Sequence, residues 1–431
     1  MTLSNYKTIR IFLILLLGGA GILHAQPAAL SLEQCYELLR THHPAAQNLP
    51  LLEVSHRLQM QNLNRQYLPQ AQLNAQATWQ SDVTALPIEV PLPGFNIPTI
   101  SQDQYRATLE LRQTLWDGGV NARQKDIQTA GTQVARQSVE VELHNLKNQV
   151  NTLYFSILLA DAQQELNNVL QENLQARIQR MEAAVANGAA TRANLYSLQA
   201  ELLKAEQQAI SIQANRRSAV ASLALLLQQE LNENMIFAKP DVNNSITNTE
   251  IQRPELTLFQ YQQQLLTAQS DLIPAINLPK FSAFATGGYG RPGLNFLDND
   301  FTPYAIVGVG MSWNVSNLYT GKQRNDQQIL SIQQQQVDVQ RQAFLLQTNT
   351  QIQQLYHEIT RLQASLRKAE QQIALRETIR QTAEAQLDNG IITSADYLVE
   401  LNAENQAKLD RTIQELQLLL TNANYEVIIG R

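Results

Sequence analysis

Several residue types are scarce in this sequence. Its 431 residues include one Cys, which excludes a disulfide framework and any metal site built from several cysteines. Only 16% of residues are charged and the net charge is -6, without a basic stretch, so nucleic acid is not an expected partner. Aromatic residues reach only 6%. Gln is instead abundant, with 56 residues, about three times its usual share. The chain is therefore polar without being highly charged.

The first 25 residues are typical of a signal peptide. Lys7 and Arg10 form a short basic region, the apolar run 11–17 follows, and cleavage is predicted after Ala25. The alternative is a permanent anchor, but the run is shorter than the roughly 20 residues that span a bilayer. No later segment reaches 18 apolar residues, so we predict an exported protein without transmembrane helices.

The sequence contains two similar halves. Asn187-Gly188-Ala189-Ala190-Thr191 and Asn389-Gly390-Ile391-Ile392-Thr393 are 202 positions apart, and Pro44 and Pro69 have counterparts 210 positions later. We predict a tandem duplication, with repeats at 26–238 and 254–431 joined by a linker at 239–253.

Each repeat contains two long segments in which apolar residues recur every three or four positions, a spacing that predicts helices packed as coiled coils. They form a predicted helical hairpin with its tip near 187–194 in one repeat and near 389–396 in the other. Gln, Asn, Thr and Ala between the apolar positions suit helices packed on both sides, as in the wall of a tube. An exposed coiled coil, the alternative, is normally richer in Lys and Glu.

Four shorter segments, at about 69–81, 103–116, 280–290 and 303–316, alternate between apolar and polar residues. This pattern is typical of strands of a membrane β-barrel, with apolar side chains toward lipid and polar ones toward the lumen. The alternative is a half-buried sheet on a soluble core. The predicted lumen residues are Arg106, Glu110 and Arg112. The predicted lipid-facing residues are Leu73, Trp79, Tyr105, Leu109, Leu111, Val307, Val309 and Trp313.

Four strands are too few for a barrel, because bacterial barrels have at least eight. Open strand edges are also excluded from lipid by their unpaired backbone groups. We therefore expect other copies of the chain to complete the barrel, and three copies would supply twelve strands.

Several short motifs, in this order and spacing, resemble the TolC-like outer-membrane efflux proteins over essentially all of the mature chain. They are Leu30-Ser31-Leu32-Glu33-Gln34-Cys35, His43-Pro44-Ala45, Leu68-Pro69, Leu115-Trp116-Asp117-Gly118-Gly119 and the two Asn-Gly turns. The resemblance implies a mainly α fold with a small β part. It would be a homotrimer, with an outer-membrane barrel of twelve strands that continues into an α-helical barrel in the periplasm. It also implies a periplasmic adaptor, or membrane fusion protein, and through it an inner-membrane pump or ABC transporter.

The hairpin tips carry the clearest local prediction. Gly188 and Gly390 suit the left-handed conformation that ends a helix, and Thr191 and Thr393 suit the cap of the next one. By themselves these residues predict only helical hairpins. The family resemblance implies contact with the adaptor at Gly188, Ala189, Thr191, Gly390, Ile391 and Thr393.

Glu384 and Asp388 are candidates for a pore constriction, because acidic rings near the tip close the mouth in this family. Threefold symmetry would triple each charge, and a carboxylate ring favours cations. The alternative is an ordinary solvated helix end. Gln381 stands where some relatives carry a further Asp.

Signals for catalysis are poor. Gly288-Tyr289-Gly290-Arg291-Pro292-Gly293 matches a dinucleotide fingerprint in letters only, since no helix is expected to follow it. We predict no enzyme activity, cofactor or metal site. The leading function is a passive exit duct of an efflux or type I secretion system, whose cargo the sequence does not name. The alternatives are a periplasmic helical scaffold or binding protein without a pore, and a purely structural coiled coil.

Overall fold

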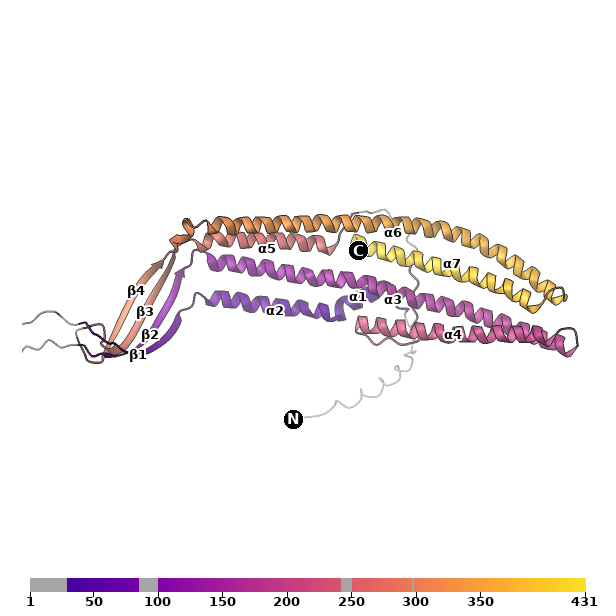
Figure 1. Cartoon of the computed structure of the whole chain (residues 1–431), viewed down its shortest axis with the longest axis horizontal. Coiled ribbons are helices and arrows are strands. Elements are labelled where there is room, and N and C mark those ends of the chain that lie inside the picture. Colours follow the sequence, from indigo (N-terminus) through magenta and orange to yellow (C-terminus); the bar gives the residue numbers. More distant parts are fainter. Residues whose placement is uncertain (1–28, 85–99, 242–249, 297) are drawn as a thin grey trace, which may run out of the picture. The chain divides into compact units, whose positions relative to one another are not determined.

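The structure is a computed structural model that describes residues 29–84, 100–241, 250–296 and 298–431. The predicted signal peptide, residues 85–99 of the connection between the first two strands and part of the predicted linker lie outside these residues. Figure 1 shows the order of helices and strands. They are α1 (Leu32–His42), α2 (Pro44–Arg65), β1 (Gln70–Trp79), β2 (Asp103–Trp116), α3 (Val120–Ala186), α4 (Arg192–Leu227), α5 (Pro254–Ile276), β3 (Lys280–Arg291), β4 (Thr302–Ser312), the 3-10 helix η1 (Val315–Leu318), α6 (Lys322–Asp388) and α7 (Ser394–Ile429).

The long helices confirm the internal repeat. α3 and α6 each contain 67 residues, and α4 and α7 each contain 36. α6 and α7 each start 202 residues after their counterparts, the same offset as the two Asn-Gly turns. The shorter helices α2 and α5 both begin at a proline, whose fixed φ and missing N–H suit the first turn of a helix.

Local capping explains where the first two helices begin. Ser31 and Gln34 bond reciprocally before α1: the Ser31 N–H donates to Gln34 Oε1 at 2.8 Å and the Gln34 N–H donates to Ser31 Oγ at 3.2 Å. This is a capping box, which satisfies two otherwise orphaned N–H groups. At the start of α2, His43 Nδ1 accepts the Ala45 N–H at 3.2 Å. Cys35 on α1 is fully buried, as a small apolar side chain would be.

The described residues form two compact units. One comprises residues 29–38, 152–241 and 369–416, and so contains both hairpin tips. Its core lies where the last turns of α3 and α6 pack with the first turns of α4 and α7. Leu174, Leu198, Leu387 and Leu401 are among its buried members. Leu198 and Leu401 belong to the segments in which apolar residues recur every three or four positions, and both lie in this core.

The other unit comprises residues 39–84, 100–151, 250–296, 298–368 and 417–431, and contains the sheet. Ile352, Ile359 and Leu362 on α6 pack with the end of α7 in one core cluster. A smaller cluster joins Ala45 on α2 to Val139 and Leu143 on α3. Both clusters are stripes along helices, as the three-to-four spacing predicts.

The four strands form one antiparallel sheet in the order β1-β2-β3-β4, and Figure 1 shows them side by side. Three of the four predicted strands agree with the structure to within two residues at each end. β4 is shorter than expected, because it ends at Ser312 rather than near residue 316. Asn314 accepts the Ser316 N–H at 3.2 Å and starts η1, which ends the extended chain.

Among the helices of the described residues, none combines the length and the apolar character that a membrane crossing requires.

Candidate channel surfaces

One face of the sheet is apolar and exposed in the single chain. The register places Leu73 opposite Leu109, and Leu111 lies opposite Ala285, which in turn lies opposite Val307. Leu73 is 75% exposed and Val307 is 78% exposed. The predicted lipid-facing residues within the strands share this face: Leu73, Trp79, Tyr105, Leu109, Leu111, Val307 and Val309. Such a continuous apolar surface requires a partner or a lipid environment.

Trp313 lies one residue beyond β4. Its indole Nε1–H donates to the carbonyl oxygen of Asn277 at 2.9 Å, and the residue is 47% exposed. The apolar ring with a bonded N–H suits a membrane–water boundary rather than the hydrocarbon centre.

The opposite face carries the predicted lumen residues. Gln72 pairs with Glu110, Gln76 with Arg106 and Gln70 with Arg112. Glu110 and Arg112 form an ion pair at 2.7 Å on this face.

The polar face also carries three apolar or aromatic residues that the alternation did not predict there: Phe284, Tyr304 and Ile306. Tyr304 lies opposite Gly288, and a Cβ atom at Gly288 would come within 2.2 Å of the Tyr304 ring. Phe284 covers Gly308 in the same way, with its ring 2.7 Å from such a Cβ atom. Glycine paired with an aromatic residue across neighbouring strands is the signal that identifies this packing.

Aromatic residues and one ion pair gather where β2 and β3 approach the loops. Arg291 forms an ion pair with Asp103 and lies over the rings of Tyr105 at 5.6 Å and Phe301 at 5.4 Å. Tyr289 stacks on Phe301 with 5.7 Å between ring centroids. Tyr105 and Tyr289 lie on the apolar face, so they form an aromatic girdle at one end of the exposed surface.

The two hairpin tips end α3 and α6 in the same way. Gly188 and Gly390 have φ angles of 73° and 71°, where a Cβ atom is strained. At the first tip, the Ala189 N–H bonds back to Ala184 and the Gly188 N–H to Val185. The second tip repeats both bonds, so each is a Schellman motif. A Cβ atom added at either glycine would have no other atom within 4 Å, so both turns face open space.

The caps of the following helices differ between the tips. At the second tip, Thr393 and Asp396 bond reciprocally: the Thr393 N–H donates to Asp396 Oδ2 at 2.9 Å and the Asp396 N–H donates to Thr393 Oγ1 at 3.3 Å. At the first tip, Thr191 accepts the Asn194 N–H, but Asn194 Oδ1 instead accepts the Ser394 N–H at 3.3 Å. Asn194 therefore links the two tips of one chain. Sequence spacing alone gives no signal for this bond.

Glu384 and Asp388 both form ion pairs with Arg177, whose side chain is only 4% exposed. Arg177 Nη1 donates to Asp388 Oδ1 at 2.5 Å, and Nη2 lies 2.9 Å from Glu384 Oε1 without hydrogen-bond alignment. The Arg177 guanidinium also lies 4.8 Å from the Tyr397 ring centroid. The two carboxylates predicted for the constriction are thus compensated by a buried cation, Arg177, which no sequence motif indicates.

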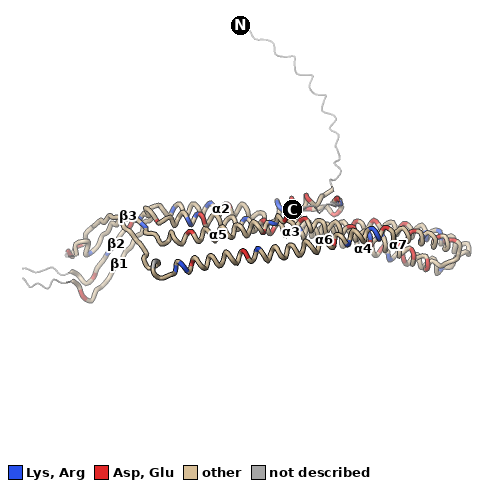
Figure 2. The backbone as a smooth tube through the Cα atoms, turned by 90° about the horizontal axis from the view of Figure 1, so that it is seen from above, with Lys and Arg blue, Asp and Glu red and all other residues tan. Residues whose placement is uncertain are grey.

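A ladder of ion pairs continues along the same hairpins. Arg380 bonds to Glu384 at 2.5 Å and to Glu404 at 2.7 Å, and Lys408 bonds to Glu404 at 2.6 Å. Burial is the largest influence on Glu404 and raises its pKa, but the hydrogen bonds from Lys408 and Arg380 outweigh it and hold the pKa below its ordinary value. Figure 2 shows both signs of charge interspersed along the helices. These helices bear no large field of one sign.

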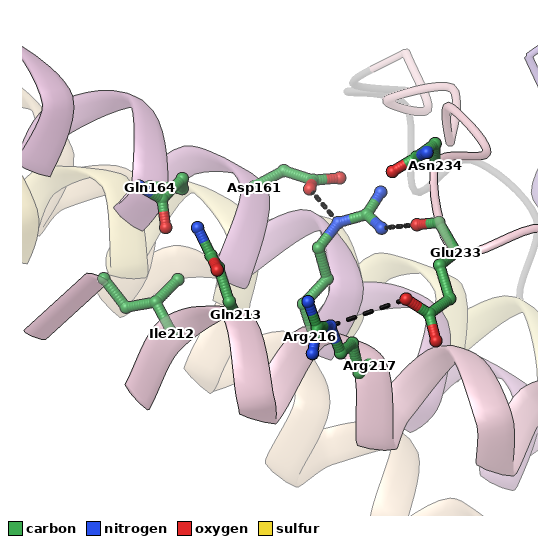
Figure 3. A pocket seen from close by; sticks show the side chains of 8 residues that line it. All are labelled: Asp161, Gln164, Ile212, Gln213, Arg216, Arg217, Glu233 and Asn234. Atoms are coloured by element: carbon green, nitrogen blue, oxygen red, sulfur yellow. Dashed lines mark hydrogen bonds and ion pairs between the residues drawn. The ribbon is translucent and has the colours of Figure 1, made fainter. Parts of the chain in front are cut away.

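A pocket in the same unit lies between α3, α4 and the segment that follows α4 (Figure 3). Arg216 fills it by donating to Asp161 Oδ1 at 2.5 Å and to the carbonyl oxygens of Glu233 and Met235. Arg217 forms an ion pair with Glu233 at 3.5 Å. The bonds of Arg216 and Arg217 hold the segment that follows α4 against the hairpin. Because both guanidinium groups are paired, neither is left to bind an anionic ligand.

A buried polar cluster lies in the unit that contains the sheet. His144 on α3 is buried, and its Nε2–H donates to the carbonyl oxygen of Val427 at 2.7 Å. Arg253 and Glu255 form a buried ion pair nearby. Burial, the largest influence, lowers the pKa of His144, and the positive charge of Arg253 lowers it further. The cluster fixes the end of α7 against α3.

Within the described ranges, no three His, Cys, Asp or Glu side chains come together as a metal site.

Residues 52–228 match the family model described as outer membrane efflux protein. The predicted family resemblance is confirmed. No curated relative matches the chain. Among solved structures, the chain has the fold of the outer membrane protein VceC of Vibrio cholerae, with a TM-score of 0.65 and 16% identity over 93% of this chain and 96% of VceC.

Two further structures with this TolC-like fold are outer membrane channels. The CmeC channel of Campylobacter jejuni has a TM-score of 0.66 and 14% identity over 93% of this chain and 85% of CmeC. The MtrE channel of Neisseria gonorrhoeae, in its open state, has a TM-score of 0.66 and 15% identity over 93% of this chain and 89% of MtrE. These are channels rather than enzymes, and at such identities the likeness establishes the fold.

Proposed function

We propose that this chain is one of three identical protomers of an outer-membrane exit duct. The duct passively conducts solutes delivered by a periplasmic adaptor and an inner-membrane pump or ABC transporter. One observation carries the proposal: a four-stranded sheet whose apolar face is exposed, whose other face is polar, and whose outer strands β1 and β4 each pair with only one strand among the described residues.

Lipid explains the apolar face. Burying a side chain such as Leu73 contributes about 1.5–3 kcal/mol relative to leaving it in water. The unpaired edges oppose insertion of a single sheet, because each unpaired backbone group in hydrocarbon costs several kcal/mol. Pairing β1 of one copy with β4 of the next removes both edges at once, and a ring of three copies gives a closed barrel of twelve strands.

The hairpin tips are the proposed adaptor contacts. Gly188 and Gly390 face open space, and Ile391 is 71% exposed although it is apolar. The bond between Asn194 and Ser394 holds the two tips of one chain together, so an adaptor would meet them as one surface.

Arg177 offsets the negative charge of the constriction proposed at Glu384 and Asp388. With the carboxylates paired, a threefold ring at this level is close to neutral, and closure would rest on hairpin packing more than on an acidic ring. Glu384→Gln combined with Asp388→Asn tests the acidic ring directly. Unchanged conductance in that variant would remove the carboxylates as a selectivity element.

Membrane fractionation combined with seam cross-linking tests the proposed function. We expect the protein in the detergent-soluble outer-membrane fraction as trimers that survive mild detergent. Cysteines introduced in β1 and β4 should then join neighbouring copies into dimers and trimers. Cys35 is fully buried and should give a low background. Recovery as a soluble periplasmic monomer would contradict the duct and favour a helical scaffold without a pore.

A further inference from the structure

The charges on the polar face of the sheet are unbalanced, although the chain as a whole is acidic. Arg106, Glu110, Arg112 and Lys280 lie on this face, because the register and the strand alternation place them with Gln70, Gln72 and Gln76. Three positive charges stand against one negative charge, so the face carries a net charge of about +2 in each copy. The entire chain has a net charge of -6.

The single carboxylate on this face is already engaged. Glu110 forms its ion pair with Arg112 at 2.7 Å, which leaves Arg106 and Lys280 to set the net charge. In the part of the chain that the structure describes, neither Arg106 nor Lys280 forms an ion pair. Glu110 lies four residues from Arg106 along β2, about 14 Å at 3.4 Å per residue. That separation exceeds a Debye length at physiological salt.

The surroundings of Arg106 leave its charge unopposed across the sheet. Its row consists of Gln76, Gly290 and Thr302, none of which is charged. Arg106 and Lys280 are both exposed in the chain. The other ion pair of the sheet, Arg291 with Asp103, belongs to the strand ends beside the girdle and is neutral as a pair. Asp82, Asp298 and Asp300 lie in the loops outside the strands.

We propose that Arg106 and Lys280 make the barrel lumen electropositive and bias the exit toward anionic solutes. The inference rests on the proposed trimeric duct, with the polar face toward the lumen. Threefold symmetry then produces one ring of three Arg106 side chains near the girdle end of the barrel and one ring of three Lys280 side chains at the opposite end of the strands. Rings of Arg or Lys favour anions in a pore, because each unpaired cation lowers the energy of a passing anion and raises that of a cation.

Reversal potentials of trimers in planar bilayers under a KCl gradient test this inference. Compared with wild type, the double variant Arg106→Gln, Lys280→Gln should shift the reversal potential toward that of a K⁺-selective pore. The shift should be larger in dilute salt, where charges are screened less. The matched control, Glu110→Gln with Arg112→Gln, removes a compensated pair and should leave the reversal potential close to wild type.

Charge can also be changed after assembly, which separates selectivity from folding. In trimers of Arg106→Cys, a trimethylammonium-ethyl methanethiosulfonate should move the reversal potential back toward wild type. A sulfonato-ethyl methanethiosulfonate should move it further toward K⁺ selectivity. Identical reversal potentials for wild type, the double variant and both modified forms would overturn the inference while leaving the duct intact. Absence of current from wild-type trimers would instead contradict the duct itself, and with it the inference.

Discussion

Leu73→Arg is the substitution that best separates a membrane barrel from a soluble sheet. Leu73 is 75% exposed in the chain, near the middle of β1 and on the apolar face. In a soluble protein, such an exposed substitution changes the free energy of unfolding by no more than about 0.5 kcal/mol. In a barrel, Arg on the lipid face near the bilayer midplane costs about 2–4 kcal/mol. Three copies raise the cost to about 6–12 kcal/mol for each trimer.

Gln72→Arg is the matched control, because Gln72 is the adjacent residue of the same strand and lies on the polar face. Both variants should be made with the same signal peptide and compared as trimers in the outer-membrane fraction, with the melting temperature of detergent-solubilised trimers as a second readout. We expect Leu73→Arg to lower trimer yield strongly and Gln72→Arg to leave it near wild type.

Two results would refute the assignment of faces. One is a wild-type yield and melting temperature for Leu73→Arg. The other is an equal loss of trimers in Gln72→Arg, which would show that this strand tolerates no Arg on either face.

Three further predictions concern the helices. Gly390→Val should abolish transport and adaptor cross-linking while trimers persist, because a β-branched residue at a φ of 71° costs about 1–2 kcal/mol and reshapes the tip. The control Gly131→Ala, within α3, should leave transport and cross-linking unchanged. Wild-type cross-linking in Gly390→Val would count against the adaptor contact. Arg177→Met should destabilise the tip by about 1–3 kcal/mol, because Glu384 and Asp388 both lose a buried partner. An unchanged rate of proteolysis at the tip would disprove this. Because the pKa of His144 is lowered in the folded chain, below about pH 6.5 the unfolded chain binds a proton at His144 more readily than the folded chain does. Unfolding titrations should therefore show that the free energy of unfolding decreases as the pH is lowered through this range, and that it decreases less in His144→Gln. Equal slopes in the two proteins would show that His144 is not responsible.

The sequence predicted the elements whose signal is periodic. The strict alternation around Leu73 and Leu109 identified two strands and their apolar faces, and the two Asn-Gly turns, 202 residues apart, predicted the two helical hairpins. Glycine followed by a capping threonine defines a local motif, so Gly390 and Thr393 behaved as expected. These features depend on residues that are close together in the sequence, so one sequence is enough to predict them.

Long-range partners were harder to predict. Nothing near Glu384 in sequence signals that Arg177, some 200 residues earlier, neutralises it, because ion-pair partners depend on which helices pack together. The bond from Ser394 to Asn194 was missed for the same reason. Trp313 was assigned to a strand because the apolar alternation continues past Ser312, although Asn314 turns the chain there. Periodicity indicates which face a residue occupies, but not where a side-chain bond interrupts the strand.

The proposed duct requires that several copies of this chain together form a conducting pore. Single-channel recording of purified trimers in planar bilayers tests it most directly, with trimers locked by β1-to-β4 cross-links as the defined species. The duct predicts discrete current steps from cross-linked trimers and none from monomers of the same preparation. Trimers that insert without conducting ions, or protein that remains monomeric and soluble without detergent, would contradict it.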